Sequence, residues 1–214
     1  NNFSHKKYTM ESLTEKYRPT KLNDCILPLR IKSKLEKWKT RMSNHLIFYG
    51  NSGNGKTSTA LALAQELSPN DYIIINASKE NSVNYMNEYV AKTMRGISLY
   101  GDKRIIILDE SDGLTYNAQT ALRRPLEEYS HLSSVIFTFN FNKKIIAPIM
   151  SRCFSFCFNA EVDEIDETKI QLKKRLKRII KLENIEIDNN DLKKIIEDNH
   201  LNFRNAVKEL EWFI

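Results

Sequence analysis

The sequence has little with which to build a disulfide scaffold, a zinc site or a membrane span. Three cysteines occur among 214 residues, with no CxxC pair, and the four histidines are scattered. We therefore expect neither disulfides nor zinc, and a reducing compartment such as the cytosol. The longest purely aliphatic run is residues 105–108, much shorter than the roughly 20 residues of a membrane helix. Neither a membrane span nor a secretory signal is expected.

Internal repeats and low-complexity tracts are also lacking. Hydrophobic residues make up 41% of the chain, enough for the core of one α/β domain and a small companion. The net charge of +6 is uneven: residues 1–160 carry 22 Lys and Arg against 14 Asp and Glu, whereas residues 161–214 carry 11 against 13. This asymmetry suits contact with nucleic acid, although a modest positive charge also serves solubility alone.

Five short apolar runs alternate with helical patterns along the first three quarters of the chain. Near-continuous apolar strands separated by helices predict an α/β fold, with a parallel sheet covered by helices on both faces. Only helical patterns follow the fifth run. We therefore expect one domain over residues 1–160 and a small helical domain over residues 161–214. The predicted strands are 46–49, 72–76, 105–108, 135–139 and 154–158, and the helical patterns between them include 30–42, 81–96 and 115–130.

The stretch GNSGNGKTST is built to hold phosphate. It matches G-x-x-x-x-G-K-[ST] through Gly50, Gly55, Lys56 and Thr57, with a further glycine at Gly53. A strand pattern precedes it and a helical pattern follows, an order that aims backbone N–H groups and the positive end of the helix at an anion. Lys56 is expected to reach the β- and γ-phosphates of a nucleotide, and the Thr57 hydroxyl to ligate magnesium.

Polar residues follow the third and fourth predicted strands, at the edge where parallel sheets bind ligands. Asp109 is placed to hold magnesium through water, and Glu110 to orient and deprotonate an attacking water. This acidic pair favours hydrolysis of ATP over transfer to a substrate, although it also fits an N-cap followed by an exposed acid. Asn140 suits a contact with the γ-phosphate or its water, or the start of a turn.

Two arginines are placed to supply positive charge. Arg152 lies just before the fifth strand, too far along the fold to reach its own phosphate but well placed to enter a neighbour's site. Arg204 opens the third helix of the small domain, where it can close onto phosphate and couple the lid to the nucleotide. Taken alone, each also fits an ordinary surface arginine.

Six segments, in the right order, resemble the AAA+ ATPase subunits of sliding-clamp loaders. The resemblance covers nearly the whole chain. It is to the small subunits of replication factor C and, through KYRPTKLNDCILP, to the large subunit of the phage-type loader. It implies a P-loop AAA+ fold with a helical lid, ATP and Mg²⁺ as cofactors, and activation by a neighbouring subunit. The segments are EKYRP, GNSGNGKTS, LDESD, AQTALRRPLEEYS, FNFNKKIIAPIMSRC and NFRNAVKEL.

The resemblance also implies roles by position. Asn140 would be the first sensor, Arg204 the second, and Arg152 the finger inserted in trans, beside the acidic pair Asp109 and Glu110. The triphosphate would be bound by Gly53, Asn54, Gly55, Lys56, Thr57 and Ser58, and the adenine side lined by Glu15, Lys16, Tyr17 and Ile26.

The partners implied are the other subunits of a ring, expected to be a pentamer, together with a sliding clamp and primer-template DNA. Backbone N–H groups and hydroxyls at helix N-termini would track duplex phosphates, although ordinary N-capping fits equally well. Because the chain stops at Ile214, about where a lid ends, the family's helical collar is expected to be absent. The residues implied in DNA contact are Lys79, Asn81, Ser82 and Thr115.

The chain departs from the family pattern at two positions. Ser111 replaces the usual Ala of the acidic box, and Pro125 stands inside an expected helix, which it should kink. The aim of Gln119, Arg123 and Arg124 toward a neighbouring subunit therefore stays open. Two other functions also stay open. A nucleotide-dependent scaffold would not need the intact Glu110, and a helicase or helicase loader would share the ATP site but lack the KYRP segment.

Overall fold

The centre of the molecule is a five-stranded parallel sheet in the order β2-β3-β4-β1-β5. The computed structural model describes residues 11–98, 103–140, 145–199 and 201–214. The predicted α/β fold is confirmed, and the strand bounds agree within two residues. The strands are β1 (His45–Tyr49), β2 (Tyr72–Asn76), β3 (Arg104–Asp109), β4 (Ser133–Phe139) and β5 (Cys153–Cys157).

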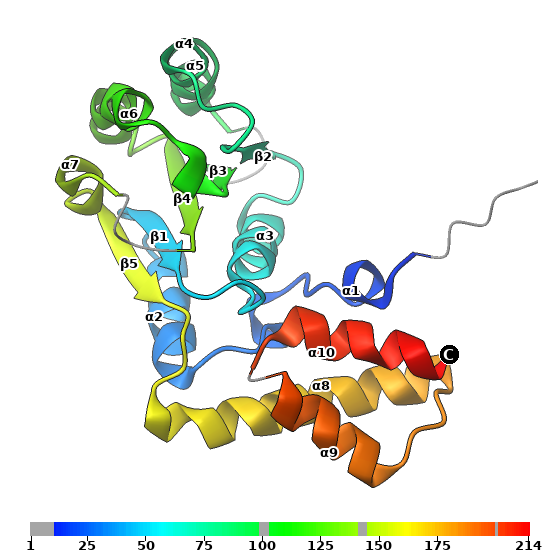
Figure 1. The fold of residues 1–214 in the computed structure, drawn as a ribbon. Helices are drawn as coiled ribbons and strands as arrows, with labels where there is room; N and C mark the ends of the chain where they lie inside the picture. The colour runs from blue at the N-terminus through cyan, green and yellow to red at the C-terminus, as the bar shows by residue number, and fades with distance from the viewer. Residues whose placement is uncertain (1–10, 99–102, 141–144, 200) are drawn as a thin grey trace, which may run out of the picture.

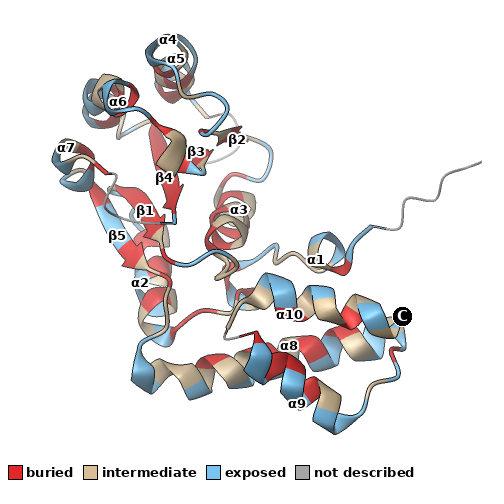
Figure 2. Cartoon of the chain, viewed as in Figure 1, coloured by how far each residue is buried: buried red, intermediate tan, exposed pale blue. Residues whose placement is uncertain are grey.

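Helices cover both faces of the sheet (Figure 1). On one face lie α2 (Leu29–Lys39) and α3 (Lys56–Leu67). The other face carries α6 (Tyr116–Glu128), α7 (Ala147–Met150) and a helix over 83–95. Because helices cover both faces, the central strands β1, β3 and β4 are buried almost throughout (Figure 2). The 83–95 helix consists of α4 (Val83–Tyr85), a π turn (Met86–Val90) and α5 (Ala91–Arg95).

Three further helices lie together beside the sheet domain (Figure 1). Their apolar faces share a separate core, to which the N-terminal α1 (Leu13–Lys16) adds Leu13. No helix among the residues described is long and apolar enough to span a bilayer. A division near residue 160 stays a prediction, since α1 packs against the second part. The helices are α8 (Ile165–Glu183), α9 (Asn189–Asp198) and α10 (Phe203–Glu209), and short 3₁₀ turns cover Leu22–Asp24, Ser111–Gly113, Val162–Glu164 and Leu210–Phe213.

Helix α6 continues through Pro125, which is buried. The Tyr129 N–H donates to the Pro125 carbonyl at 3.0 Å, so hydrogen bonding resumes beyond the ring. Arg123 and Arg124 are exposed on this helix. Gln119 is instead buried, and its Oε1 accepts from the Ile146 N–H at 3.0 Å. Gln119 therefore holds α7 to α6 and does not reach the surface.

His45, at the start of β1, ties α6 to the sheet. Its side chain is 2% exposed. Its Nδ1 accepts from the Val135 N–H at 3.0 Å, so Nε2 carries the proton and donates to the Leu126 carbonyl at 2.6 Å. Burial lowers the pKa of His45 from 6.5 to about 4. The neutral ring is therefore part of the folded structure.

Acidification should destabilise the fold through this histidine. Between pH 6.5 and 4 the unfolded chain binds a proton at His45 that the folded chain does not. The free energy of unfolding therefore decreases as the pH is lowered through this range. The contribution lost is roughly 3 kcal/mol across this window. Urea unfolding should show a steeper decline for the natural chain than for His45→Gln, whereas replacing the exposed His131 by Gln should keep that decline. Equal slopes in all three proteins would contradict the assignment.

Candidate nucleotide-binding site

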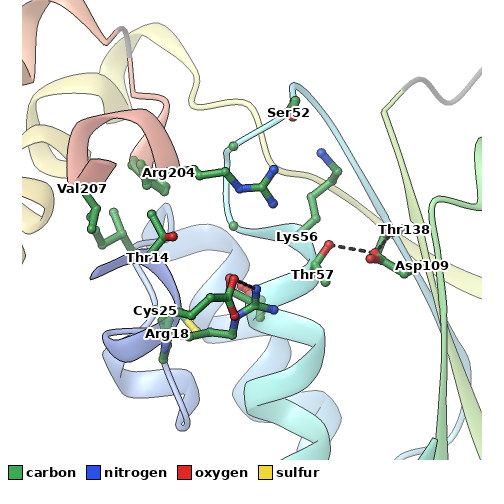
Figure 3. Close-up of a pocket in the computed structure, with 18 of the residues that line it drawn as sticks. Thr14, Arg18, Cys25, Ser52, Lys56, Thr57, Asp109, Thr138, Arg204 and Val207 are labelled. Atoms are coloured by element: carbon green, nitrogen blue, oxygen red, sulfur yellow. Dashed lines mark hydrogen bonds and ion pairs between the residues drawn. The ribbon is translucent and has the colours of Figure 1, made fainter. Parts of the chain in front are cut away.

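A cavity of about 320 Å³ opens at the carboxyl edge of the sheet, between the loop after β1, the N-terminal segment and α10 (Figure 3). Segments far apart in the sequence meet there. Predicted site residues that line it are Glu15, Tyr17, Ile26, Gly53, Gly55, Lys56, Thr57, Ser58, Asp109, Glu110, Asn140 and Arg204.

The loop between β1 and α3 has the backbone of a phosphate cradle. Gly53 and Gly55 have φ angles of 85° and 83°, which glycine adopts without steric cost. Gly55 is the N-cap of the twelve-residue α3 and offers no side-chain cap. The N–H groups of the first turn therefore stay available at the positive end of the helix, where an anion binds well.

The Lys56 ammonium is buried within this loop. Its Nζ donates to the carbonyl oxygens of Gly50 and Asn51, both at 2.8 Å. Burial lowers the pKa of Lys56, and the nearby carboxylates of Asp112 and Asp109 oppose that shift. An ammonium has three N–H donors, and the hydrogen bonds of the described residues use two, so a phosphate oxygen can take the third.

Asp109, at the end of β3, joins α3 to β4. Its Oδ1 accepts from the Thr57 hydroxyl at 2.8 Å and from the Thr138 hydroxyl at 2.6 Å (Figure 3). Thr138 was not predicted; it is 2% exposed and also accepts from the Glu110 N–H at 3.1 Å. The role of Thr138 depends on contacts with residues far away in the sequence. The one sequence signal that could have indicated it was a hydroxyl within an otherwise apolar strand.

Thr57 and Asp109 offer the oxygen ligands that Mg²⁺ prefers. Within the described residues, no three His, Cys, Asp or Glu side chains gather as a metal site. Mg²⁺ is commonly held by one or two carboxylates together with substrate phosphates. The residues therefore fit a magnesium ion that binds with a nucleotide.

Glu110 is held in an unusual conformation. Its φ is 54°, in the left-handed region, which costs a non-glycine residue of order 1 kcal/mol and tends to occur at functional sites. Its Oε2 lies 3.2 Å from the Asn76 Nδ2 and 2.9 Å from the Ser78 Oγ. Asn76 pairs in register with Asp109 on the neighbouring strand, which places it beside the acidic pair. Neither Asn76 nor Ser78 was predicted, although Asn76 ends a strand that is otherwise apolar.

The two residues predicted to be sensors, Asn140 and Arg204, both line the cavity. Asn140 follows the last residue of β4 and is exposed. Its backbone N–H donates to the Asp112 Oδ2 at 2.7 Å. Arg204, on α10, points toward Lys56 (Figure 3). Its positive charge contributes to lowering the pKa of Lys56.

The N-terminal segment lines the other side of the cavity. Glu15 lies there but pairs with Arg18 at 2.5 Å, and the Tyr17 hydroxyl donates to Glu183 of α8. Lys16 pairs with the same Glu183 at 2.6 Å and does not line the cavity. The segment is therefore attached to α8, the first helix of the predicted lid (α8 to α10), as well as to the cavity.

Arg152 lies outside the cavity. Its Nη2 lies 2.5 Å from the Glu127 carboxylate, and its Nη1 donates to the Pro148 carbonyl at 2.8 Å. The side chain is 28% exposed, in a separate surface hollow that Arg123 and Arg124 also line. The structure therefore does not bring Arg152 to its own phosphate loop, in agreement with the sequence argument.

The residues expected to contact DNA come from two adjoining loops. The hydroxyls of Ser82 and Thr115 accept from backbone N–H groups three residues on, both at 3.1 Å, so each is an N-cap. Asn81 donates to the Gly113 carbonyl at 3.4 Å, which joins the loops, and Lys79 is exposed. Both hydroxyls keep their protons for a ligand.

The family model described as "ATPase family associated with various cellular activities (AAA)" matches residues 46–184. The chain belongs to this family. The AAA+ fold expected from the sequence is thereby confirmed. The match takes in β1, the phosphate loop, the acidic pair and Arg152, and it ends just after α8.

Similar proteins include those named replication factor C small subunit. The one from Thermoplasma volcanium is 36% identical over 94% of this chain, and the one from Picrophilus torridus 37% over 92%. This chain spans 64% and 62% of the lengths of these two relatives, respectively.

Solved structures share the fold. A RuvB point mutant from Thermotoga maritima has a TM-score of 0.72 at 19% identity, covering 92% of this chain and 65% of that one. A DNA polymerase III gamma subunit-related protein from the same organism has a TM-score of 0.55 at 15% identity, with 81% and 69% covered.

Thr138 gives a direct test of the site geometry. Thr138→Val keeps the side-chain shape but leaves the Glu110 N–H without its acceptor and Asp109 without one donor. We expect a loss of about 1–2 kcal/mol in the free energy of unfolding, measured with urea. Thr138→Ser retains the hydroxyl and should recover most of it. Equal stability of the Val variant and the natural chain would contradict the network.

Proposed function

We propose that this AAA chain is an ATPase subunit of a DNA sliding-clamp loader. The observation that carries the proposal is the division of the catalytic groups between two surfaces. Lys56, Asp109 and Glu110 line one cavity, whereas Arg152 lies in a separate surface hollow. Such a site is complete only when a neighbour adds its arginine. The names of the relatives support the same reading.

Each group in the cavity has a chemical task in ATP hydrolysis. The N–H groups of the phosphate loop, Lys56 and Arg204 would hold the phosphates, while Thr57 and Asp109 would hold Mg²⁺. Bound magnesium would neutralise charge on the phosphates. Glu110 would accept a proton from the attacking water.

The restraint on Glu110 offers a physical route from DNA to hydrolysis. Ser78, which contacts Glu110, belongs to the same loop as Lys79, Asn81 and Ser82. Phosphates bound at this loop and at Thr115 would compete for its donors and shift Ser78. Glu110 would then be released toward the water. DNA contact and hydrolysis would thus share one hydrogen-bond network.

The proposed partners are neighbouring subunits of a ring, a pentamer by analogy, with a sliding clamp and primer-template DNA. Binding of ATP would organise the ring to open the clamp and grip DNA, and hydrolysis would release the clamp. A helicase or helicase loader and an assembly scaffold are the alternatives. A helicase would separate strands in a gel assay, and a scaffold would keep full function after Glu110→Gln.

Clamp capture tests the proposal. Glu110→Gln keeps a hydrogen-bonding side chain but removes the base, so the chain should stay in the ATP-bound state. In a pull-down with its sliding clamp, this variant should retain the clamp with ATP and lose it with ADP. Lys56→Ala, which removes a phosphate contact, is the matched control and should retain none. Clamp retention that is absent, or equal with both nucleotides, would contradict a loader.

Arg152 is expected to act on a neighbouring copy or subunit. Arg152→Ala should leave the dissociation constant for ATP within about twofold and reduce DNA-stimulated hydrolysis at least a hundredfold, because charge stabilisation in the transition state is lost. Glu127→Gln, which frees the arginine from its ion pair, should not reduce hydrolysis.

Mixing two inactive variants makes the test sharper. An Arg152→Ala copy retains its own site, and a Glu110→Gln copy retains its arginine, so their mixture should regain hydrolysis. Failure of the mixture to exceed either variant alone would argue against action in trans.

A further inference from the structure

Asn159, just beyond β5, binds the phosphate loop from outside the cavity. Its Oδ1 accepts from the Asn51 N–H at 2.8 Å and from the Asn54 Nδ2 at 3.1 Å. Asn54 was expected to bind the triphosphate, but its amide faces Asn159 and does not line the cavity. The Asn159 Oδ1 therefore joins the backbone of Asn51 to the side chain of Asn54 within the phosphate loop.

The contact is too close to be incidental. Gly50 has a φ of 143°, and a Cβ at this position would lie 2.8 Å from the Asn159 Oδ1 and 3.2 Å from its backbone N. The Asn54 amide also lies 3.4 Å from the Phe158 carbonyl. The loop therefore packs directly on the chain that leaves β5, where only glycine fits.

Asn159 is braced on its other side. The Arg30 Nη2, from α2, donates to the Asn159 carbonyl at 2.9 Å. The same guanidinium pairs with Glu164 at 2.9 Å and with Glu161 at 3.2 Å. These two glutamates form the capping box that begins the helical lid. The phosphate loop is thus connected through Asn159 and Arg30 to the start of the lid.

We propose that Asn159 is a positioning residue that holds the phosphate loop in its binding shape and links it to the lid. The inference rests on the proposed binding of ATP. Asn159 touches no phosphate position, since it does not line the cavity. It acts by fixing Asn51 and Asn54 before the ligand arrives, so that ordering the loop does not weaken binding.

The test compares dissociation constants for ATP, ADP and adenosine, measured by calorimetry on the intact chain. Asn159→Ala should weaken ATP and ADP about tenfold each, the factor expected if about one loop residue must be ordered on binding, and leave adenosine unchanged. Asn159→Asp keeps the acceptor but adds negative charge, so its losses should grow with the number of phosphates. Asn190→Ala, at an exposed position on α9, is the control and should bind as the natural chain does.

A double variant separates positioning from packing. Because the Asn54 side chain is joined to the Asn51 backbone through Asn159, Asn54→Ala should add little to Asn159→Ala. The melting temperature of Asn159→Ala without nucleotide should fall by no more than about 2 °C, since its partners remain near solvent. Unchanged affinity for ATP, or a loss that adenosine shares, would overturn the inference but leave the proposed function standing. A natural chain that binds no ATP would overturn both.

Discussion

The site depends on the contact of one carboxylate with two hydroxyls. Asp109, Thr57 and Thr138 belong to β3, α3 and β4, and their hydrogen bonds fix the phosphate loop relative to the end of the sheet. Because hydrogen bonds to an ionised group are stronger than neutral ones, this arrangement resists small displacements of α3. The proposed magnesium ligands and the proposed catalytic base Glu110 are both positioned by this contact, since the Glu110 N–H donates to the same Thr138.

Two polar networks diverge from this centre. One passes from Glu110 through Ser78 to the loops at the N-termini of the helices on the far face of the sheet. The other passes from the phosphate loop through Asn159 and Arg30 to the lid. On the opposite side, the Phe203 N–H at the start of α10 donates to the Gly53 carbonyl at 3.2 Å. The phosphate loop thus lies between two attachments to the helical part of the chain, one at α10 and one at the start of α8.

The fold was readable from sequence because its signals are local. Five apolar runs, a glycine-rich turn and a final stretch without strands predict a parallel sheet and a helical end, as observed. Thr138, Asn76 and Asn159 were not found, because their roles arise from partners 29, 34 and 108 residues away in the sequence. Lys16 failed to line the cavity for the same reason: Glu183, far along the chain, attracts its ammonium. Spacing identifies residues that bind a shared ligand, whereas it does not identify residues that bind each other.

Under the proposed function, the position of Arg152 outside the cavity would make hydrolysis a property of an assembly. The guanidinium is paired with Glu127, a side chain that is 71% exposed, so the pair is screened by solvent and contributes little to stability. Exchanging this partner for the phosphate charge of a neighbour would therefore cost little, and the greater charge would favour the exchange. A buried ion pair would have held the arginine in place. A weak, exposed pair keeps the side chain oriented at the surface and lets it leave, which is what an arginine that acts on another subunit requires.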